Sequence, residues 1–322
     1  MGKNIPKKII CCGETLFDLV AKKSSKGKPL TLHAYPGGSA TNTSMILALL
    51  DLPVALMSRL GTDSLSQSLI SILKDKGIDT RHIIKDKNIN APLALASIDS
   101  KGNSSYIFYG KEVPHKDKAQ HLCETPFKSA VVFHASSFFS YSDVFFRSVM
   151  KRLRLAKKRN VFITYDPNWR ESKIPNKAKA RQRIKKILAY VDLVKLSEDD
   201  ALHITQAKTL NKALEKIKKH LKGDIIVTLG TKGAFYWNGK KKITQPAFKV
   251  RIKDTIGAGD GFTAGLIYRY SADGKDAFLK NMKRNLEFAS AVSALICSGH
   301  GAVQGLTGLR QVNDFLRSHA TR

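Results

Sequence analysis

A run of small residues flanked by aspartates, Asp254-Thr255-Ile256-Gly257-Ala258-Gly259-Asp260-Gly261, stands directly before the helical pattern of Phe262–Tyr270. Small residues ahead of a helix let successive backbone N–H groups converge on an anion, with the positive end of the helix dipole behind them. Asp260 then lies in the first helical turn, where its carboxylate can accept the proton of an attacking hydroxyl while the amides stabilise a transferring phosphoryl group. The alternative without chemistry is a glycine-rich turn in which Asp260 caps the helix.

Further polar motifs stand where apolar runs end. They are Gly13-Glu14-x-x-x-Asp18, Pro36-Gly37-Gly38-Ser39-Ala40-x-Asn42, Gly61-x-Asp63, Asp166-Pro167-Asn168-x-Arg170 and Thr228-x-Gly230-x-x-Gly233. A carboxylate accepts hydroxyl protons, an amide both donates and accepts, and an arginine offers a planar donor fork to oxyanions. Taken singly, each motif is better explained as a surface turn, a helix cap or a solvated side chain.

Short apolar runs rich in β-branched and aromatic residues alternate with longer amphipathic stretches. The predicted strands are Lys8–Cys12, Val54–Arg59, Ala130–Ala135, Val161–Asp166, Leu193–Leu196 and Asp224–Leu229. The predicted helices are Ala40–Leu50, Ser64–Lys76, Tyr141–Arg159, Lys177–Tyr190, Glu198–Ile204 and Asn211–Leu221. This alternation predicts an α/β fold of βαβ units, with a mostly parallel sheet and helices on both faces.

Two regions, about 16–34 and 93–109, interrupt the alternation, and each reads as strand, polar turn and strand. Hairpins placed between βα units cannot all join the central sheet, so we expect them to pair with each other as a small accessory sheet. Such a sheet would cover the carboxyl ends of the core strands, where α/β proteins bind ligands. Because the chain has no repeat or low-complexity linker, residues 1–322 are predicted to form one domain with this sheet as a lid.

The composition is that of an ordinary globular protein except for its charge. Of 322 residues, 43% are hydrophobic, and 55 Lys and Arg against 26 Asp and Glu give a formal net charge of +29. Such an excess raises the question of a nucleic-acid partner. The basic residues interleave with Leu, Ile and Ala at helical spacing and no aromatic residues alternate with them, which favours solvated helix faces over a specific nucleic-acid site.

The cysteines and the apolar runs bear on the compartment. The four cysteines (Cys11, Cys12, Cys123, Cys297) form no C-x-x-C pair, which favours a reducing compartment over a disulfide framework. No run approaches the roughly 18 apolar residues of a membrane span, and the apolar run after Lys8 is too short for an export signal. We therefore expect a cytoplasmic protein with no membrane partner.

Together the motifs resemble those of the ribokinase-like (PfkB) carbohydrate kinases, and they occur in that family's order. Asp-Thr-x-Gly-Ala-Gly-Asp resembles the family signature, and the pair Gly301-Ala302 stands where the family carries its late glycine-alanine pair. The resemblance covers nearly the whole chain. It implies a ribokinase-like three-layer α/β/α core with a small β-sheet lid, ATP and Mg²⁺ as cosubstrates, and a sugar or sugar-like alcohol as phosphoryl acceptor.

The resemblance also implies roles for residues, position by position. Asp260 matches the catalytic base, with Gly257, Ala258 and Gly259 as the anion hole, and Asp254 matches a residue beside a monovalent cation such as K⁺. The residues matching sugar or phosphate ligands are Asp18, Gly38, Asn42, Asn168 and Arg170. Those on the nucleotide side are Ser197, Thr228, Gly230, Gly233, Gly301 and Ala302. Ser197 departs from a frequent Asn, and we interpret the run from Lys195 to Asp200 as the mark of a fructokinase-like subgroup.

These observations predict an ATP-dependent sugar kinase, most like bacterial fructokinases, that phosphorylates a primary hydroxyl. A 2-keto-3-deoxygluconate kinase, in which Arg170 would pair with the substrate carboxylate, is one alternative, and a ribokinase or nucleoside kinase is another. A basic nucleic-acid-binding protein on the same fold is the alternative from a different class. The chain lacks a Gly-x-x-x-x-Gly-Lys-Ser/Thr loop, a Gly-x-Gly-x-x-Gly loop and zinc-spaced His/Cys clusters. A homodimer through the lid is also expected.

Overall fold

An eight-stranded, mostly parallel sheet forms the centre of the computed structural model, which describes residues 8–22, 31–98, 104–109, 125–136 and 142–319. Its strand order is β14-β13-β12-β11-β10-β9-β1-β4. The strands are β1 (Lys8–Cys12), β4 (Val54–Met57), β9 (Ala130–Ser136), β10 (Phe162–Asp166), β11 (Leu193–Ser197), β12 (Asp224–Thr228), β13 (Ala234–Trp237) and β14 (Lys242–Gln245). All neighbours from β4 to β12 pair in parallel, and β13 and β14 extend the sheet in antiparallel fashion.

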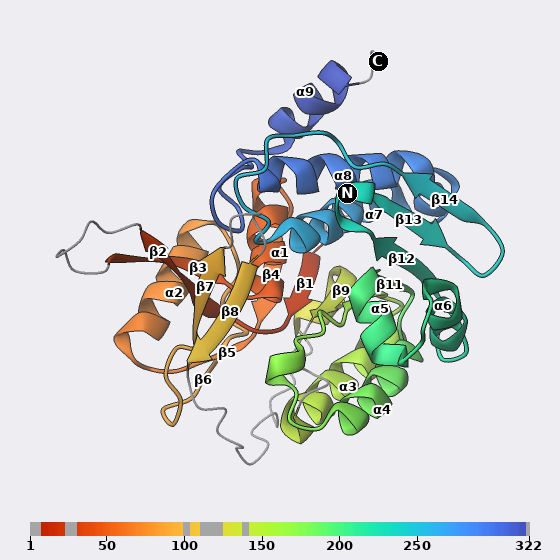
Figure 1. The fold of residues 1–322 in the computed structure, drawn as a ribbon. Coiled ribbons are helices and arrows are strands. Elements are labelled where there is room, and N and C mark those ends of the chain that lie inside the picture. The colour runs from red at the N-terminus through yellow and green to blue at the C-terminus, as the bar shows by residue number, and fades with distance from the viewer. Residues whose placement is uncertain (1–7, 23–30, 99–103, 110–124, 137–141, 320–322) are drawn as a thin grey trace, which may run out of the picture.

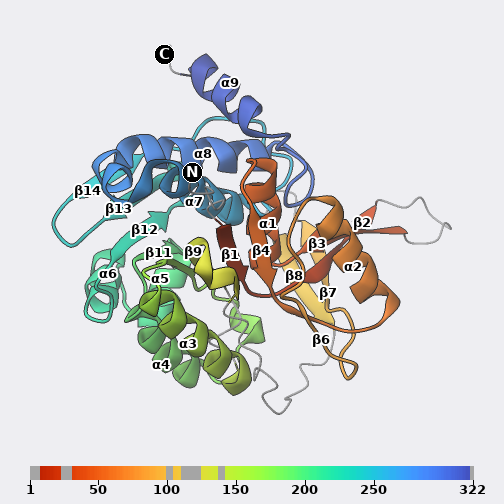
Figure 2. The same ribbon diagram turned by 180° about the vertical axis from the view of Figure 1, so that it is seen from behind.

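Helices cover both faces of this sheet (Figures 1 and 2). One face carries α1 (Ser39–Leu49), α2 (Ser64–Asp75), α7 (Ala258–Lys280) and α8 (Met282–Cys297), and α9 (Leu309–His319) packs on α8. The other face carries α3 (Asp143–Lys158), α4 (Lys177–Leu188), α5 (Glu198–Thr205) and α6 (Leu210–Lys218). In β1 the side chains alternate between the two layers, because Ile9 and Cys11 pack with the first group and Ile10 and Cys12 with the second. This arrangement confirms the predicted three-layer α/β/α core.

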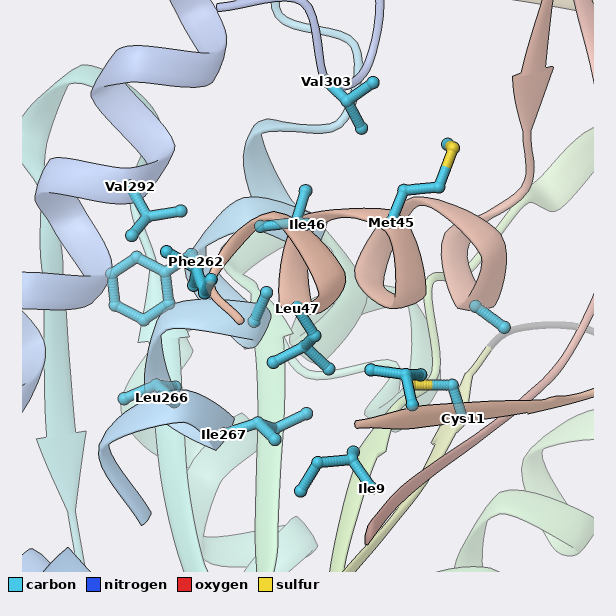
Figure 3. Packing of buried hydrophobic residues seen from close by; sticks show 14 of the residues in the cluster. Ile9, Cys11, Met45, Ile46, Leu47, Phe262, Leu266, Ile267, Val292 and Val303 are labelled. Carbon is cyan, nitrogen blue, oxygen red and sulfur yellow. The ribbon is translucent and has the colours of Figure 1, made fainter. Parts of the chain in front are cut away.

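Helix α1 is buried along most of its length, from Ser39 to Leu47. Its apolar half packs Met45, Ile46 and Leu47 between α7 and the central strands (Figure 3). Its first two turns, in contrast, carry hydroxyl and amide side chains in a fully buried position. Buried polar groups need hydrogen-bond partners. The polar half of α1 therefore indicates a polar site in the interior, next to the apolar core.

The predicted accessory sheet is also present. It has four strands in the order β3-β2-β7-β8, namely β2 (Leu16–Lys22), β3 (Thr31–Gly37), β7 (Leu93–Ile98) and β8 (Ser104–Tyr109). The two hairpins join through a parallel β2–β7 pair, and their turns at 23–30 and 99–103 lie outside the described residues. In Figure 1 this sheet stands to one side of the central sheet.

Several predicted boundaries need correction. The expected strand Val54–Arg59 is wrong at its end, because Ser58 breaks it and Arg59–Leu60 (β5) pairs instead with Ile84–Lys85 (β6). The helix expected from Phe262 begins at Ala258. The strands β13 and β14 and the helices α8 and α9 are not among the predicted elements, and the predicted helix start at Tyr141 lies outside the described residues. No helix in the part of the chain that the structure describes is long and apolar enough to cross a membrane.

Candidate active site

A pocket opens beside the carboxyl end of β1, between the central sheet, the accessory sheet and the start of α7. From β1 the chain turns to β4 on one side and later to β9 on the other, which makes this the switch point where α/β sheets bind ligands. The pocket is lined by Glu14, Leu16, Asp18, Gly38, Ser39, Asn42, Phe108, Asn168, Arg170, Ile256, Gly257 and Asp260. The structure thus brings together all five predicted sugar or phosphate ligands with the predicted base.

Asp260 lies in the first turn of α7 and only 8% of its surface is exposed. The hydroxyl of Ser39 donates to its Oδ1 (2.7 Å), and the Nδ2 of Asn42 donates to its Oδ2 (2.9 Å). Burial raises the pKa of Asp260, while these two hydrogen bonds and the nearby Lys195 oppose the rise. Its carboxylate is therefore held in one orientation, since the two donors come from successive turns of α1.

Asn42 has an unused acceptor in this arrangement. Its amide nitrogen is bonded to Asp260, whereas its Oδ1 is buried without a hydrogen-bond partner. A buried orphan acceptor costs free energy unless a ligand supplies a donor. A hydroxyl group in the pocket would satisfy it.

Asp18 is the second carboxylate of the pocket and lies on β2 of the accessory sheet. It is 6% exposed, and burial together with the charge of Asp260 raises its pKa to about 7, against the opposing effect of Arg170. Along the rung Tyr35–Asp18–Ala94–Phe108 of the accessory sheet, paired side chains share the face that looks into the pocket. The accessory sheet therefore contributes a polar contact as well as a cover.

The start of α7 is shaped by Gly257, which has φ 77° and caps the helix. A Cβ on this residue would also lie 2.6 Å from the carbonyl oxygen of Ala302, so only glycine fits here. The amides of Gly257, Ala258 and Gly259, predicted to form the anion hole, are called the cradle below. Of these, the amide of Ala258 donates to Thr255 O at 3.2 Å. Any anion bound at this helix start would have to compete with that weak turn bond.

Asp254 lies behind the same turn and is 1% exposed. Its Oδ1 accepts from the amide of Ile256 and its Oδ2 from the amide of Gly301, both at 2.8 Å. The carboxylate therefore ties the turn before α7 to the late Gly301-Ala302 loop. Its expected place beside a monovalent cation stays a prediction.

Four of the predicted nucleotide-side residues lie at or just after the carboxyl ends of β11 and β12, outside the pocket lining. Ser197 and Thr228 are register partners at the ends of these two strands. The hydroxyl of Ser197 accepts from Asp200 N in a capping box that starts α5. Gly230 and Gly233 flank the short turn after β12, with φ 56° and 97°. In the late loop, Ala302 lies against Gly257 at the start of α7, and Gly301 N donates to Asp254.

The loop after β10 places Asn168 and Arg170 at the pocket. The amide of Asn168 donates to Asp166 Oδ1 (3.1 Å), and Asn168 has φ 43°, a conformation that Asn tolerates better than most residues. Trp169 N donates to Asp200 Oδ1 (2.8 Å), which fixes the loop to the start of α5. Arg170 is exposed at the rim, where its guanidinium can reach a ligand.

Sequence reasoning missed three groups as site residues. Ser39 contacts the predicted base directly, Glu14 accepts from Ser39 N at 3.0 Å, and Lys195 lies buried behind Asp260. Ser39 had a usable signal, because it stands three residues before Asn42 and residues at that spacing share a helix face. Within the described ranges, no group of three or more His, Cys, Asp or Glu is placed to hold a metal ion.

Comparisons with known proteins agree with this geometry. The model of the pfkB family carbohydrate kinases matches residues 6–307. The maize "Fructokinase-1" is 29% identical, over 92% of this chain and 94% of that protein, and the Arabidopsis thaliana "Probable fructokinase-3" is 30% identical, over 98% and 92%. The crystal structure of a fructokinase with bound ATP from Xylella fastidiosa has the same fold, with a TM-score of 0.88 and 24% identity over 98% of this chain and 100% of that one.

Fold, pocket and these similarities together define an α/β sugar kinase with a polar pocket at the start of α7. The chain belongs to the pfkB family of carbohydrate kinases. This confirms the resemblance on which the residue assignments rest, whereas the role of each residue stays a prediction.

Proposed function

We propose that the protein is an ATP-dependent fructokinase that transfers the γ-phosphoryl group to a primary hydroxyl of fructose. The observation that carries the proposal is the Asp260 carboxylate, which lies at the positive end of α7 and faces a pocket lined by further hydroxyl-binding groups. The names of the relatives support fructose as acceptor, and the ATP bound to the Xylella fastidiosa fructokinase supports ATP as donor.

In this proposal Asp260 accepts the proton of the attacking hydroxyl as the bond to phosphorus forms. Ser39 and Asn42 fix the orientation of the carboxylate at the pocket wall. The backbone amides of Gly257, Ala258 and Gly259 stabilise the charge on the transferring group. The sugar hydroxyls or the phosphate are held by Asp18, Gly38, Asn42, Asn168 and Arg170. Among these, Asn42 has a buried Oδ1 that lacks a hydrogen-bond donor, which a sugar hydroxyl would supply.

The residues present fit ATP with Mg²⁺. The start of α7 at Gly257–Gly259 offers backbone amides and a helix dipole to a phosphate. In this proposal the nucleotide is bound by the turns that contain Ser197, Thr228, Gly230, Gly233 and Gly301-Ala302. Mg²⁺ is usually held by substrate phosphates and its own waters rather than by a protein cage. It would supply charge neutralisation between the phosphates. A monovalent cation such as K⁺ beside Asp254 belongs to the same proposal.

Residues 1–322 act as one kinase domain in this proposal, with the accessory sheet as its lid. Closing over the sugar, the lid would exclude the water that otherwise competes as acceptor. We further propose a homodimer through the lid, a cytoplasmic location, and no specific nucleic-acid or membrane partner.

The chemistry of the pocket keeps related acceptors open. Arg170 at the rim could pair with the carboxylate of 2-keto-3-deoxygluconate, and ribose or a nucleoside offers a primary hydroxyl like that of fructose. These acceptors differ from fructose in only a few hydroxyl groups, so the activities of the protein on each of them have to be compared directly.

ADP formation with ATP and Mg²⁺, measured against fructose, ribose, 2-keto-3-deoxygluconate, glucose and nucleosides, tests the proposal. We expect the highest kcat/KM with fructose. A higher value with 2-keto-3-deoxygluconate that is lost in Arg170→Ala would replace fructose by that acid. If no sugar stimulates ADP formation, the kinase assignment fails.

A further inference from the structure

A row of buried polar side chains lies on the face of the central sheet that packs against α7. In β10 and β11, Phe162 and Leu193 point to this face and join the apolar cluster around α7 and α8. Asp166 stands four residues after Phe162 and is 2% exposed, and Lys195 stands two residues after Leu193 and is 7% exposed. Since side chains alternate along a strand, these two point to the same face as their apolar neighbours.

Asp166 and Lys195 form an ion pair, with 3.0 Å between Lys195 Nζ and Asp166 Oδ2. A buried ion pair adds little net stability, because desolvation of the two charges offsets their attraction. Apolar residues would continue the core here at no such cost. The pair therefore calls for an explanation other than stability.

The ammonium of Lys195 lies directly against the start of α7. A Cβ added to Gly259 would stand 2.8 Å from Lys195 Nζ. Gly259 belongs to the segment whose amides form the anion cradle. The charge thus lies behind the cradle, on the side of the central sheet.

Lys195 is also the cation that balances the buried carboxylates of this region. Burial lowers the pKa of Lys195, but Asp166, Asp200 and Asp260 outweigh it, so that its pKa lies above the usual range and it stays charged. The neighbouring His134 is uncharged at neutral pH, because burial and the charge of Lys195 lower its pKa to about 3. The positive charge of this row therefore rests on Lys195.

We propose that Lys195 is a positioning residue of the kinase site, whose fixed charge behind Gly259 strengthens the phosphoryl cradle and favours the ionised form of Asp260. The inference rests on the proposed function and deepens it. Asp166 holds the ammonium in place and also fixes the loop after β10 through Asn168 N. Because the charge is set before the reaction, it needs no reorganisation when negative charge develops on the transferring group.

The effect of Lys195 on Asp260 must be weighed against the other groups around that carboxylate. They come from every neighbouring element and are Ser39 and Asn42 on α1, Asp18 on β2, Asp166 on β10, Lys195 on β11, and Glu14, Arg170 and Asp254 in the adjoining loops. Ser39 and Asn42 donate hydrogen bonds but carry no charge, and Arg170 is exposed to solvent. Removal of the buried cation leaves an excess of carboxylates, which favours the protonated form of Asp260.

The test compares the wild type with Lys195→Met, which keeps the length of the side chain and removes its charge. We expect kcat for the best sugar to fall about 10–100-fold, less than the about 10²–10³-fold loss on removal of a donor in direct contact, because Lys195 acts through the cradle. The sugar KM should change less than about threefold. The acid limb of the pH profile of kcat should move to higher pH. A folded variant with the wild-type kcat and the wild-type pH profile would overturn the proposal.

A second readout does not depend on the acceptor. If the cradle contacts the γ-phosphoryl group, Lys195→Met lowers the preference for ATP over ADP in calorimetric titrations with Mg²⁺. An unchanged preference for ATP over ADP in Lys195→Met would contradict the proposed role of Lys195 behind the cradle. If the wild type binds ATP but phosphorylates no sugar, the proposed function has failed. The role of Lys195 is then still tested by the preference for ATP over ADP in wild type and variant.

Two further variants separate electrostatics from folding. Lys195→Met/Asp166→Asn removes both buried charges, so it should fold even if the single variant does not, and it should keep the loss of kcat and of ATP preference. Wild-type values in this double variant would overturn the proposal. The matched control is Lys8→Met, which breaks the pair of Lys8 with Asp79 (2.9 Å) at the opposite end of the sheet and should leave both readouts unchanged.

Discussion

At the scale of single residues, two buried carboxylates line one small pocket, and their different surroundings suit them to different roles. Asp260 is held by two hydrogen-bond donors and lies at a helix start. Asp18 lies on the accessory sheet, and burial and the charge of Asp260 raise its pKa to about 7. Pairs of carboxylates with unlike environments commonly divide into a reacting group and a binding group. We assign Asp260 to the first role and Asp18 to the second.

Asp260→Asn should lower kcat by about 10²–10⁴-fold, the usual contribution of a general base. Asparagine keeps the size of the side chain but cannot take up the proton, so thermal unfolding and ATP affinity should change little. If Asp260 only capped α7, turnover would survive, because asparagine is also a good capping residue. A folded variant with near-normal kcat on its best sugar therefore contradicts the catalytic role.

Asp18→Asn should raise the fructose KM more than it lowers kcat, since it removes binding that is uniform along the reaction. It should also raise the melting temperature at pH 8.5 more than at pH 5.5. The folded-state pKa of Asp18 is raised, so its contribution to stability is fully present below its unfolded pKa and is lost as the pH rises through about 7. Thermal unfolding at the two pH values, with no sugar present, checks this, and equal shifts would refute it.

At the scale of elements, the helix pair α1–α7 explains both the success and the limits of the sequence analysis. The alternation of apolar runs predicted the core strands, most helices and the accessory sheet, because each pattern is local. The contact between Ser39 and Asp260 spans 221 positions and has no local signal. Lys195 could be placed on a strand, but only the packed fold shows that its face of the sheet meets the start of α7.

Other gaps have local causes. The hairpin β13–β14 turns at Asn238-Gly239, a strong hairpin signal that the strand–helix alternation concealed. The start of α7 was expected too late because small residues read as a loop, whereas in the fold they are the first turn of the helix.

Gly257→Ala tests whether the start of α7 must keep its shape. The alanine would have a strained φ and a Cβ 2.6 Å from Ala302 O, so we expect kcat to fall at least about tenfold as the cradle amides shift. Gly274→Ala is the matched control in the same helix, because it has a similar φ of 75° with no atom within 4 Å of the added Cβ. It should cost about 1–3 kcal/mol of stability but leave kcat unchanged. Equal kcat in the two variants would show that the cradle tolerates displacement.

At the scale of the whole molecule, the net charge of +29 is spread over many helices. On α3 the basic side chains Lys151, Arg154, Lys157 and Lys158 are exposed, while Val149, Leu153 and Ala156 pack inward. We predict weak, sequence-independent affinity for nucleic acid that falls steeply with salt, since simple neutralisation of phosphates behaves in this way. Binding titrations against DNA and RNA at increasing salt check this, and tight binding that survives about 0.2 M salt would favour the nucleic-acid alternative.

The accessory sheet also has an outer face, and this face is where the proposed homodimer would form. Along the rung Ala34–Leu19–Leu95–Ile107, paired side chains share the side opposite Asp18 and Phe108. Ile107 is 57% exposed and Tyr109, on the same side of β8, is 53% exposed. A cluster of exposed apolar side chains on an otherwise strongly charged protein is typical of an interaction surface.

A second copy of the chain would cover this apolar face, so the wild type should sediment as a dimer of the 35.6 kDa chain. Ile107→Glu should give a monomer, because a charge in the apolar contact is costly to bury. Its fructose KM should also rise, since the neighbouring Phe108 lines the pocket from the other side of β8 and a dimer would hold the lid in place. Leu65→Glu, at a 44% exposed apolar position on α2, is the control and should remain dimeric. A monomeric wild type, or an Ile107→Glu protein that remains dimeric, would refute the assignment of this face.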